Sequence, residues 1–182
     1  VKWFEARGIS QRTLIKMKIS EGPEWMPQTS KTENTIQFNY FINNELINVK
    51  YRDGRKNFKL VKGAEKVFYN LDSTVGHDYV VIVEGEMDAL SFVDAKIDSV
   101  VSVPNGATLN RLNLDYLDSC IEYFDDKSKI IIAVDSDEAG QNLQQELIRR
   151  FGAEVCYTIS FGEHKDANEF LLQHGSSMLK RL

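Results

Sequence analysis

The stretch KIIIAVDSDEAG, residues 129–140, constrains the fold of this chain more than any other. Its first half is a continuous run of apolar, mostly β-branched residues, which is typical of a strand buried on both faces. Its second half places Asp135 and Asp137 at the end of that strand, where side chains two apart point to the same side. Two converging carboxylates repel each other unless a cation neutralises them, and such oxygen ligands favour Mg²⁺ or Mn²⁺. The stretch therefore predicts a buried strand that ends at a metal site.

Strands and helices alternate after residue 77. We expect strands at residues 79–83, 98–103, 129–134 and 153–159, and helices at residues 86–96, 111–124, 138–151 and 167–174. Strands separated by helices pair in parallel, and ligands bind beyond the carboxyl ends of such strands. The loop after the second strand contains Asn105 and Gly106, where a backbone can closely approach a phosphate. This part is therefore predicted to be a four-stranded parallel sheet flanked by helices, an α/β fold.

Further acidic residues gather at the carboxyl edge of that predicted sheet. Glu84 follows the first strand, Asp88 lies four residues beyond it, and Asp166 lies beyond the fourth strand in the segment KDANE. An acid after a strand also caps the next helix, so the capping and ligand interpretations both stand for Glu84. For Asp166 the alternative is a capping box with Glu169, although a capping residue can still face a site.

Charge divides the chain into two parts. The whole chain has a net charge of −5, but residues 1–75 hold 13 Lys and Arg against 8 Asp and Glu, whereas residues 76–182 hold 9 against 19. A basic part joined to an acidic, metal-seeking part is what a site that processes polyanions requires. The alternative is a solvated strand face with aromatic residues in the core. The candidate phosphate-binding residues in the basic part are Lys50, Arg52, Lys56, Lys59 and Lys62.

The first 75 residues are predicted to form a small basic α+β subdomain. Residues 2–19 have a helical pattern, with Ser10 as the N-cap of a second helix. Pro23 and Pro27 then indicate irregular structure. Alternating patterns predict a small antiparallel sheet with strands at residues 35–42, 45–52 and 57–61. We therefore divide the chain into two domains, residues 1–75 and 76–182.

Several classes of site are not indicated by these residues. The sequence contains neither GxxxxGK[ST] nor a CxxC pair, which argues against a P-loop and a zinc module. His77, His164 and His174 have no ligand spacing and are assigned to surface or loop positions, and Cys120 and Cys156 are expected to be free thiols. No apolar run approaches roughly 18 residues and no signal-peptide pattern is present, so we expect a cytoplasmic protein without membrane association.

Three stretches carry a resemblance to a known family. VIVEGEMDAL, IIIAVDSDEAG and KDANEFL resemble the Toprim domain, in the form found in the primases of phage primase-helicases and the related mitochondrial helicase. A Glu after one strand and Asp-x-Asp after a later one are shared by primases, topoisomerases, some nucleases and a recombination factor. The 51-residue spacing from Glu84 to Asp135 and the segments YFDD, DEAG and KDANE are more specific to the primase-helicase branch. RGIS, FNYFINNELINVKYR and NFKLVKGAEK resemble the basic subdomain that precedes Toprim in such primases.

The resemblance implies a DNA primase, which makes RNA primers from NTPs on a single-stranded DNA template by metal-dependent nucleotidyl transfer. It implies that Asp135 and Asp137 are ligands of Mg²⁺ or Mn²⁺ and that Glu84 is a third ligand or the general base. The basic residues named above would hold template and triphosphate, and Asn105 and Gly106 would border the nucleotide. Second-tier candidates, for a further ion or for orienting its waters, are Asp88, Asp166 and Asn168.

The resemblance also implies that this is the RNA polymerase core of a longer primase-helicase from a bacterium, phage or mobile element. The zinc-binding and helicase domains of such proteins are absent from these residues, so we expect a helicase domain or partner. Two alternatives remain open. A Toprim nuclease would use the same three acids to cut, and a non-catalytic Toprim module would only bind nucleic acid. The basic subdomain and the KDANE segment favour the primase.

Overall fold

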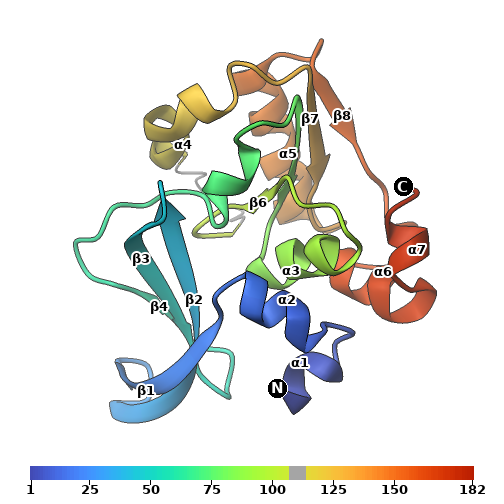
Figure 1. Ribbon diagram of the computed structural model, residues 1–182. Coiled ribbons are helices and arrows are strands. Elements are labelled where there is room, and N and C mark those ends of the chain that lie inside the picture. The colour runs from blue at the N-terminus through green and yellow to red at the C-terminus, as the bar shows by residue number, and fades with distance from the viewer. Residues whose placement is uncertain (107–113) are drawn as a thin grey trace.

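The computed structural model describes residues 1–106 and 114–182, which form two four-stranded sheets (Figure 1). The antiparallel sheet has the strand order β1 (Ser20–Met26), β2 (Lys31–Ile42), β3 (Glu45–Arg52), β4 (Phe58–Leu60). The parallel sheet has the order β6 (Val100–Ser102), β5 (Tyr79–Val83), β7 (Lys129–Ala133), β8 (Cys156–Thr158). The predicted fold class is therefore confirmed.

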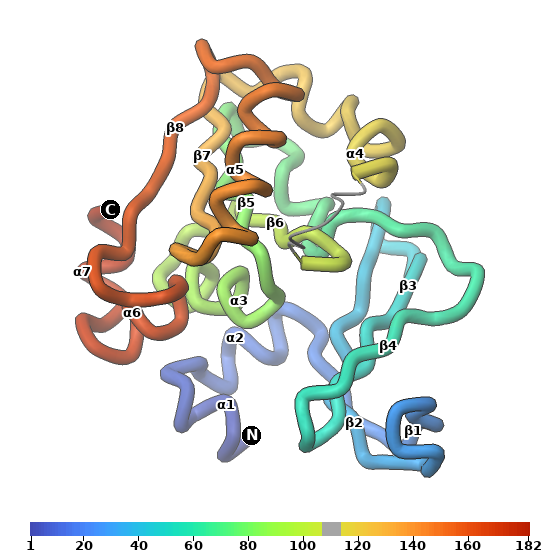
Figure 2. The backbone as a smooth tube through the Cα atoms, turned by 180° about the vertical axis from the view of Figure 1, so that it is seen from behind, coloured from blue at the N-terminus to red at the C-terminus, as the bar shows by residue number. Residues whose placement is uncertain are grey.

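Helices flank the parallel sheet, as the sequence predicted for all of them except α7. They are α3 (Glu86–Asp94), α4 (Asp115–Cys120) with the 3₁₀ turn η2 (Ile121–Tyr123), α5 (Glu138–Phe151), α6 (Ala167–His174) and α7 (Ser176–Leu179). Helix α5 lies across one face of the sheet (Figure 2), and α3 packs against β5, β6 and α6. The predicted helix at 111–124 begins at Asp115 within the described residues, whereas residues 111–113 lie outside them.

The antiparallel sheet has one strand more than the sequence patterns indicated. Residues 20–26 form β1, and β2 begins at Lys31 because β1 pairs with its first half. We had interpreted Pro23 and Pro27 as signs of irregular structure, and for Pro23 this was wrong. Pro23 pairs opposite Asn34 on β1, which is an edge strand, where a residue without an N–H is tolerated.

Two short helices precede that sheet, α1 (Lys2–Glu5) and α2 (Gln11–Lys16). Ser10 caps α2 as predicted, since its Oγ accepts a hydrogen bond from the Thr13 N–H at 3.3 Å. The Ser10 and Thr13 hydroxyls also donate to Asp94 Oδ1 at the end of α3, both at 2.6 Å. These bonds attach the beginning of the chain to the helix that starts beside Glu84.

One buried core joins the two sheets. Tyr69 bridges to Ser102 at the edge of the parallel sheet, and its ring packs edge-on against Phe38 and Tyr40 of β2, with centroids 6.1 and 5.2 Å apart. The 3₁₀ turn η1 (Leu71–Thr74) follows and leads into β5. The predicted basic and acidic parts therefore pack against each other as one unit, which fixes the basic strands relative to the acidic loops.

Cys120 and Cys156 are free thiols, as predicted. In the residues that the structure describes, no helix has the length and apolar character needed to cross a membrane.

Candidate active site

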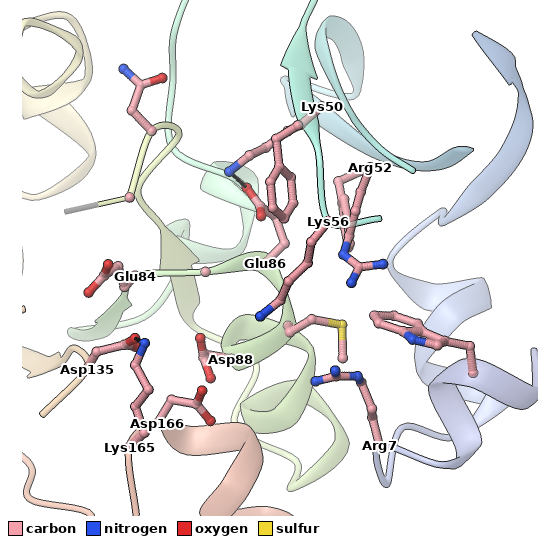
Figure 3. A pocket seen from close by; sticks show the side chains of 17 residues that line it. Arg7, Lys50, Arg52, Lys56, Glu84, Glu86, Asp88, Asp135, Lys165 and Asp166 are labelled. Atoms are coloured by element: carbon pink, nitrogen blue, oxygen red, sulfur yellow. Dashed lines mark hydrogen bonds and ion pairs between the residues drawn. The ribbon is translucent and has the colours of Figure 1, made fainter. Parts of the chain in front are cut away.

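A cavity of about 370 Å³ opens between the carboxyl edge of the parallel sheet and the antiparallel sheet. Acidic side chains lie on one side of it and cationic side chains on the other (Figure 3). The cavity brings together residues that are far apart in sequence. Nine of the predicted site residues line it: Lys50, Arg52, Lys56, Glu84, Asp88, Asn105, Gly106, Asp135 and Asp166.

Two aspartates follow β7, of which Asp135 lines the acidic wall, whereas the predicted site residue Asp137 is not among the residues that line the cavity. Lys165 links them, with its Nζ 3.0 Å from Asp135 Oδ2 and 3.2 Å from Asp137 Oδ2. Their convergence is therefore as predicted, although β7 itself ends earlier, at Ala133. Asp137 is also the N-cap of α5 and accepts the Gly140 N–H at 3.0 Å, and its role as a metal ligand remains a prediction. A Cβ on Gly140 would lie 2.1 Å from the Asp135 carbonyl oxygen, so only glycine fits there.

The two aspartates differ in their electrostatics. Burial raises the pKa of Asp135, partly offset by Lys165, and the nearby Asp166 and Asp137 charges raise it further. The Gly140 N–H, and after it Lys165, lower the pKa of the more exposed Asp137. The two carboxylates in turn raise the pKa of Lys165. Lys165 thus supplies part of the positive charge that this pair of acids requires.

Asp88 and Asp166 line the same wall, and Asp88 is buried. Burial, and then the charges of Asp166 and Asp135, hold the pKa of Asp88 well above its usual value. Asp166 caps α6 by accepting the Glu169 N–H at 2.8 Å, while Glu169 Oε2 accepts the Lys165 N–H at 3.0 Å. The N-cap bond of the predicted capping box is therefore present, whereas the Glu169 carboxylate accepts the N–H of the residue before the N-cap. Asp166 also lines the cavity.

Asn168 supports the site from behind. Its N–H donates to Asp88 Oδ1 at 3.1 Å, and its Nδ2 donates to the Arg7 carbonyl at 2.9 Å and to Ser91 Oγ at 3.0 Å. It does not line the cavity, so its predicted second-tier role becomes one of positioning. The side chain connects α6, α3 and the turn after α1.

Glu84, Asn105 and Gly106 line the part of the acidic wall that follows β5 and β6. Glu84 follows β5 directly, and Asn105 and Gly106 follow β6, the neighbouring strand. Gly106 has φ +67°, and a Cβ at this position would lie 3.8 Å from Glu84 Oε1. Because Gly106 adopts this positive φ without strain, the backbone of this loop can approach a phosphate closely, as predicted.

The cationic wall comes from α1, β3 and the turn before β4. The indole of Trp3 lies between two guanidinium groups, with Arg7 Cζ 4.7 Å and Arg52 Cζ 4.4 Å from its ring centroid. Arg52 is only 8% exposed, and burial and then the charge of Arg7 lower its pKa. In the described part of the chain, neither arginine forms an ion pair with a carboxylate. Lys56 lines the cavity from a turn organised by Asp53, which accepts N–H groups of Arg55 and Asn57.

Lys50 differs from those cations because it is paired. Its Nζ lies 2.7 Å from Glu86 Oε1, which also accepts the hydroxyl of the buried Tyr40 at 2.5 Å. Glu86 is the first residue of α3, two positions after Glu84. Lys50 therefore links the antiparallel sheet to the helix that follows the acidic loop.

Two predicted phosphate-binding residues are not brought to the cavity. Lys59 Nζ lies 2.5 Å from Glu24 Oε1 and donates to the Trp25 carbonyl at 2.6 Å. Lys62 is exposed beyond the end of β4. Their role in binding nucleic acid remains a prediction.

Sequence reasoning missed several lining residues, among them the charged and stacking side chains of Trp3, Arg7, Glu86 and Lys165. Two of these residues lie in stretches that the sequence analysis had singled out, Arg7 in RGIS and Lys165 in KDANE. Those stretches could have indicated them. The stacking of Trp3 depends on a contact between α1 and β3, which no local pattern reveals.

The donor set of the acidic wall fits a hard divalent cation. The oxygens of Glu84 and Asp135 on this wall are ligands of the kind that Mg²⁺ and Mn²⁺ prefer, and Asp137 lies beside Asp135, joined to it through Lys165. The Lys165 ammonium group already lies where positive charge is required. Within residues 1–106 and 114–182, no three acidic, histidine or cysteine side chains stand together as a complete metal site. Water and substrate phosphates commonly complete the coordination of Mg²⁺.

The fold and the cavity define an α/β protein with an acidic wall at the carboxyl edge of a parallel sheet, facing a cationic wall from an antiparallel sheet. Within that class, this chain belongs to the Toprim-like family, whose model matches residues 81–171.

The similarity to individual proteins covers more of the chain than the family match does. Over 98% of its length the chain is similar to two proteins of Arabidopsis thaliana, a primase homolog protein at 35% identity and the chloroplastic/mitochondrial Twinkle homolog protein at 33% identity. It spans 56% and 27% of their respective lengths. Its structure is similar to the primase fragment of the bacteriophage T7 primase-helicase protein, with a TM-score of 0.80 and 26% identity over 98% of this chain and 72% of that chain. The resemblance to the primase part of a primase-helicase is thereby confirmed.

Proposed function

We propose that this chain is the RNA polymerase core of a DNA primase, which joins ribonucleotides into a primer on single-stranded DNA during replication. The observation that carries the proposal is the cavity in which a cationic wall faces an acidic wall across about 370 Å³. A polyanionic substrate requires the first wall, and a metal-dependent reaction at phosphorus requires the second. The similarity to a T7 primase fragment supports the same function.

The reaction is attack of a 3′-hydroxyl oxygen on the α-phosphorus of an incoming NTP. A new P–O bond forms, the bond between the α-phosphorus and the bridging oxygen to the β-phosphate breaks, and pyrophosphate leaves. The hydroxyl proton passes to a base, for which Glu84 is the candidate unless it is a metal ligand. The protein needs no nucleophile of its own.

Glu84, Asp135 and Asp137 would hold Mg²⁺ or Mn²⁺. A bound ion would supply positive charge to the attacking and leaving oxygens. Lys165 neutralises the two aspartates before the ion binds, and its exposed stem allows it to move aside or to contact a phosphate itself. Asp166 and Asp88 would orient waters on the ion or hold a further one.

The cationic wall would hold the substrates. Arg7, Arg52 and Lys56 line the cavity opposite the acids and would bind triphosphate and template phosphates. Asn105 and Gly106 would border the nucleotide. In a longer protein, this core would act with a helicase domain or partner, a proposal supported by its similarity to the primase fragment of a primase-helicase protein.

One observation favours a second function, that of a nucleic-acid-binding module without catalysis. Lys165 already pairs with both aspartates, and the acids described here do not form a complete metal site by themselves. In such a module, Lys165 would be the permanent counter-charge of the pair.

The experiment is extension of a short RNA annealed to a single-stranded DNA template, with labelled NTPs and Mn²⁺. A preformed primer removes the need for template selection by a separate domain. We expect labelled products longer than the primer from the wild-type chain and far fewer from Asp135→Asn. Calorimetric titration of Mn²⁺ in the presence of NTP and template should show binding by the wild type only.

The other outcomes distinguish the alternatives. Shortened template without extension would indicate a nuclease. Binding of template with no Mn²⁺ uptake and no extension would indicate the non-catalytic module, and either result would overturn the primase assignment.

A further inference from the structure

Two histidines meet on the surface beside α6, away from the cavity between the two sheets. His164 Nε2 and His174 Nε2 are 2.9 Å apart, and both rings pack against Phe170, with centroids 5.6 and 4.6 Å from it. The sequence offered no ligand spacing because ten positions separate the two residues. The fold brings them together by returning the loop before α6 to the end of that helix.

The scaffold holds this pair in place before any ligand binds. Phe161 is buried and packs against Phe170. Its carbonyl accepts the His164 N–H at 3.2 Å, which anchors the turn that carries His164. His174 lies in the last turn of α6, just before Gly175. A hollow of about 460 Å³ borders both rings. The two nitrogens are therefore presented to solvent by a loop and a helix that are each fixed in the core.

The two nitrogens are within hydrogen-bonding distance of each other, and a metal ion bound by both would replace that hydrogen bond. Their spacing is also that of two ligands of one metal ion. With metal–nitrogen bonds of about 2.0–2.1 Å, nitrogens 2.9 Å apart subtend roughly 90° at the ion. That angle belongs to neighbouring positions in tetragonal or octahedral coordination, whereas a tetrahedral Zn²⁺ site would need a separation of about 3.3 Å. Imidazole is a ligand that Ni²⁺ and Cu²⁺ prefer over carboxylate oxygen.

We propose that His164 and His174 form a surface site for a first-row transition-metal ion of tetragonal preference, represented by Ni²⁺. Both Nε2 atoms coordinate the ion and water fills its remaining positions. The site is distinct from the acidic wall, where carboxylate oxygens select Mg²⁺ or Mn²⁺. It depends neither on primer synthesis nor on the proposed function.

The site is nevertheless connected to the acidic wall. His164 immediately precedes Lys165, whose carbonyl accepts the Ser136 N–H at 2.9 Å and whose ammonium group contacts Asp135 and Asp137. An ion at the histidine pair therefore fixes the segment that positions Lys165.

The experiment is calorimetric titration of NiCl₂ into the chain, freed of any histidine tag, in chelator-treated buffer. We expect saturable binding of one ion per chain that excess Mg²⁺ does not abolish. His164→Gln and His174→Gln should each weaken it at least tenfold, and Ni²⁺ should raise the Tm of the wild type but not of the double variant.

The chain provides a matched control. His77→Gln removes the third histidine of the sequence, which packs against Tyr79, and should leave Ni²⁺ binding unchanged. Wild-type affinity in the His164→Gln, His174→Gln double variant, with its far-UV circular dichroism intact, would overturn the proposal. Absence of saturable Ni²⁺ binding by the wild type would overturn it as well.

Discussion

The two walls of the cavity balance their charges differently. On the acidic wall, Lys165 contacts both Asp135 and Asp137, and Asp137 accepts a helix N–H besides. On the cationic wall, Arg7 and Arg52 stack on Trp3, and among the described residues neither has a carboxylate partner. The Asp135 and Asp137 carboxylates are therefore balanced by groups of the protein, whereas Arg7 and Arg52 keep their charge for an external anion. Substrate binding should therefore depend on aromatic stacking on the cationic wall. On the acidic wall it should depend on replacement of the Lys165 ammonium group by a metal cation.

The largest expected effect is that of Asp135→Asn, because it removes a carboxylate that Lys165 shares and that would hold the metal. We expect primer extension to fall by roughly 10²-fold or more, since a catalytic cation contributes several kcal/mol and each 1.36 kcal/mol is tenfold in rate. Single-turnover extension of an annealed primer with Mn²⁺ measures this.

Folding provides the control for that variant. Burial disfavours the charged form of Asp135, so the neutral amide should leave the Tm in metal-free buffer unchanged or higher. Extension at the wild-type rate would remove Asp135 from the reaction and, with it, the acidic wall's role as a metal site.

A smaller effect should follow from Trp3→Leu on the opposite wall. The indole separates two guanidinium groups, and each cation–π contact contributes about 0.5–2 kcal/mol. Losing it should raise KM for NTP roughly fivefold to tenfold, by the equivalence of 1.4 kcal/mol with a factor of ten, and change kcat little. Steady-state kinetics over an NTP series separates the two constants.

The chain contains a matched control for that change. Trp25, the second tryptophan, is 52% exposed on β1, so Trp25→Leu should leave KM unaltered. Trp3→Phe should restore part of the affinity, because the phenyl ring still offers a face to both arginines. Equal KM values in Trp3→Leu and Trp25→Leu would refute the role of stacking.

Asp88→Asn tests the electrostatic cost of the acidic wall through stability. The pKa of Asp88 is raised in the fold, chiefly by burial, so the folded state binds its proton more tightly than the unfolded state. Stability therefore falls as pH rises through the interval between the unfolded and the folded pKa. The amide removes this loss and can still accept the Asn168 N–H through its oxygen.

We expect the Tm of Asp88→Asn to exceed that of the wild type by a few degrees at neutral pH, where each kcal/mol corresponds to about 2–4 °C for a chain of this size. The difference should vanish at acidic pH, where both forms are neutral. Thermal unfolding in metal-free buffer across this pH range is the measurement. A variant that is less stable than the wild type at neutral pH would contradict the sign.

The acidic wall was predictable from the sequence because its geometry is local. Asp135 lies two residues beyond the end of β7, and Asp137 and Asp166 are the N-caps of α5 and α6, so the end of an apolar strand and capping chemistry place them without knowledge of the rest of the fold. Strand alternation does not extend to Asp135 and Asp137, because β7 ends at Ala133. The boundaries of α5 and α6 agree with the prediction for the same reason. The missing strand β1 shows where this fails, since Pro23 is compatible with a strand only at an edge.

The cationic wall could not be predicted in the same way. Whether a lysine of the basic segment faces the cavity depends on the partner of its strand and on the packing of α1. Lys50, Lys56 and Lys59 look alike in sequence, yet the first pairs with Glu86, the second lines the cavity and the third pairs with Glu24. Charge pattern indicated the segment, and only tertiary contacts separated its members.

The smallest effect, and the one that separates those members, is expected from Lys56→Ala compared with Lys59→Ala. Each phosphate contact with single-stranded nucleic acid contributes about −0.7 to the slope of log K against log salt. Lys56 faces the cavity and should lower the magnitude of that slope by about this amount when removed. Lys59 is already 2.5 Å from Glu24, so its loss should change the slope little.

Fluorescence anisotropy of labelled single-stranded DNA over a salt series measures the slope for both variants. Equal slopes for the two variants would mean that the basic segment acts as a whole, and that the cavity is not what distinguishes its lysines.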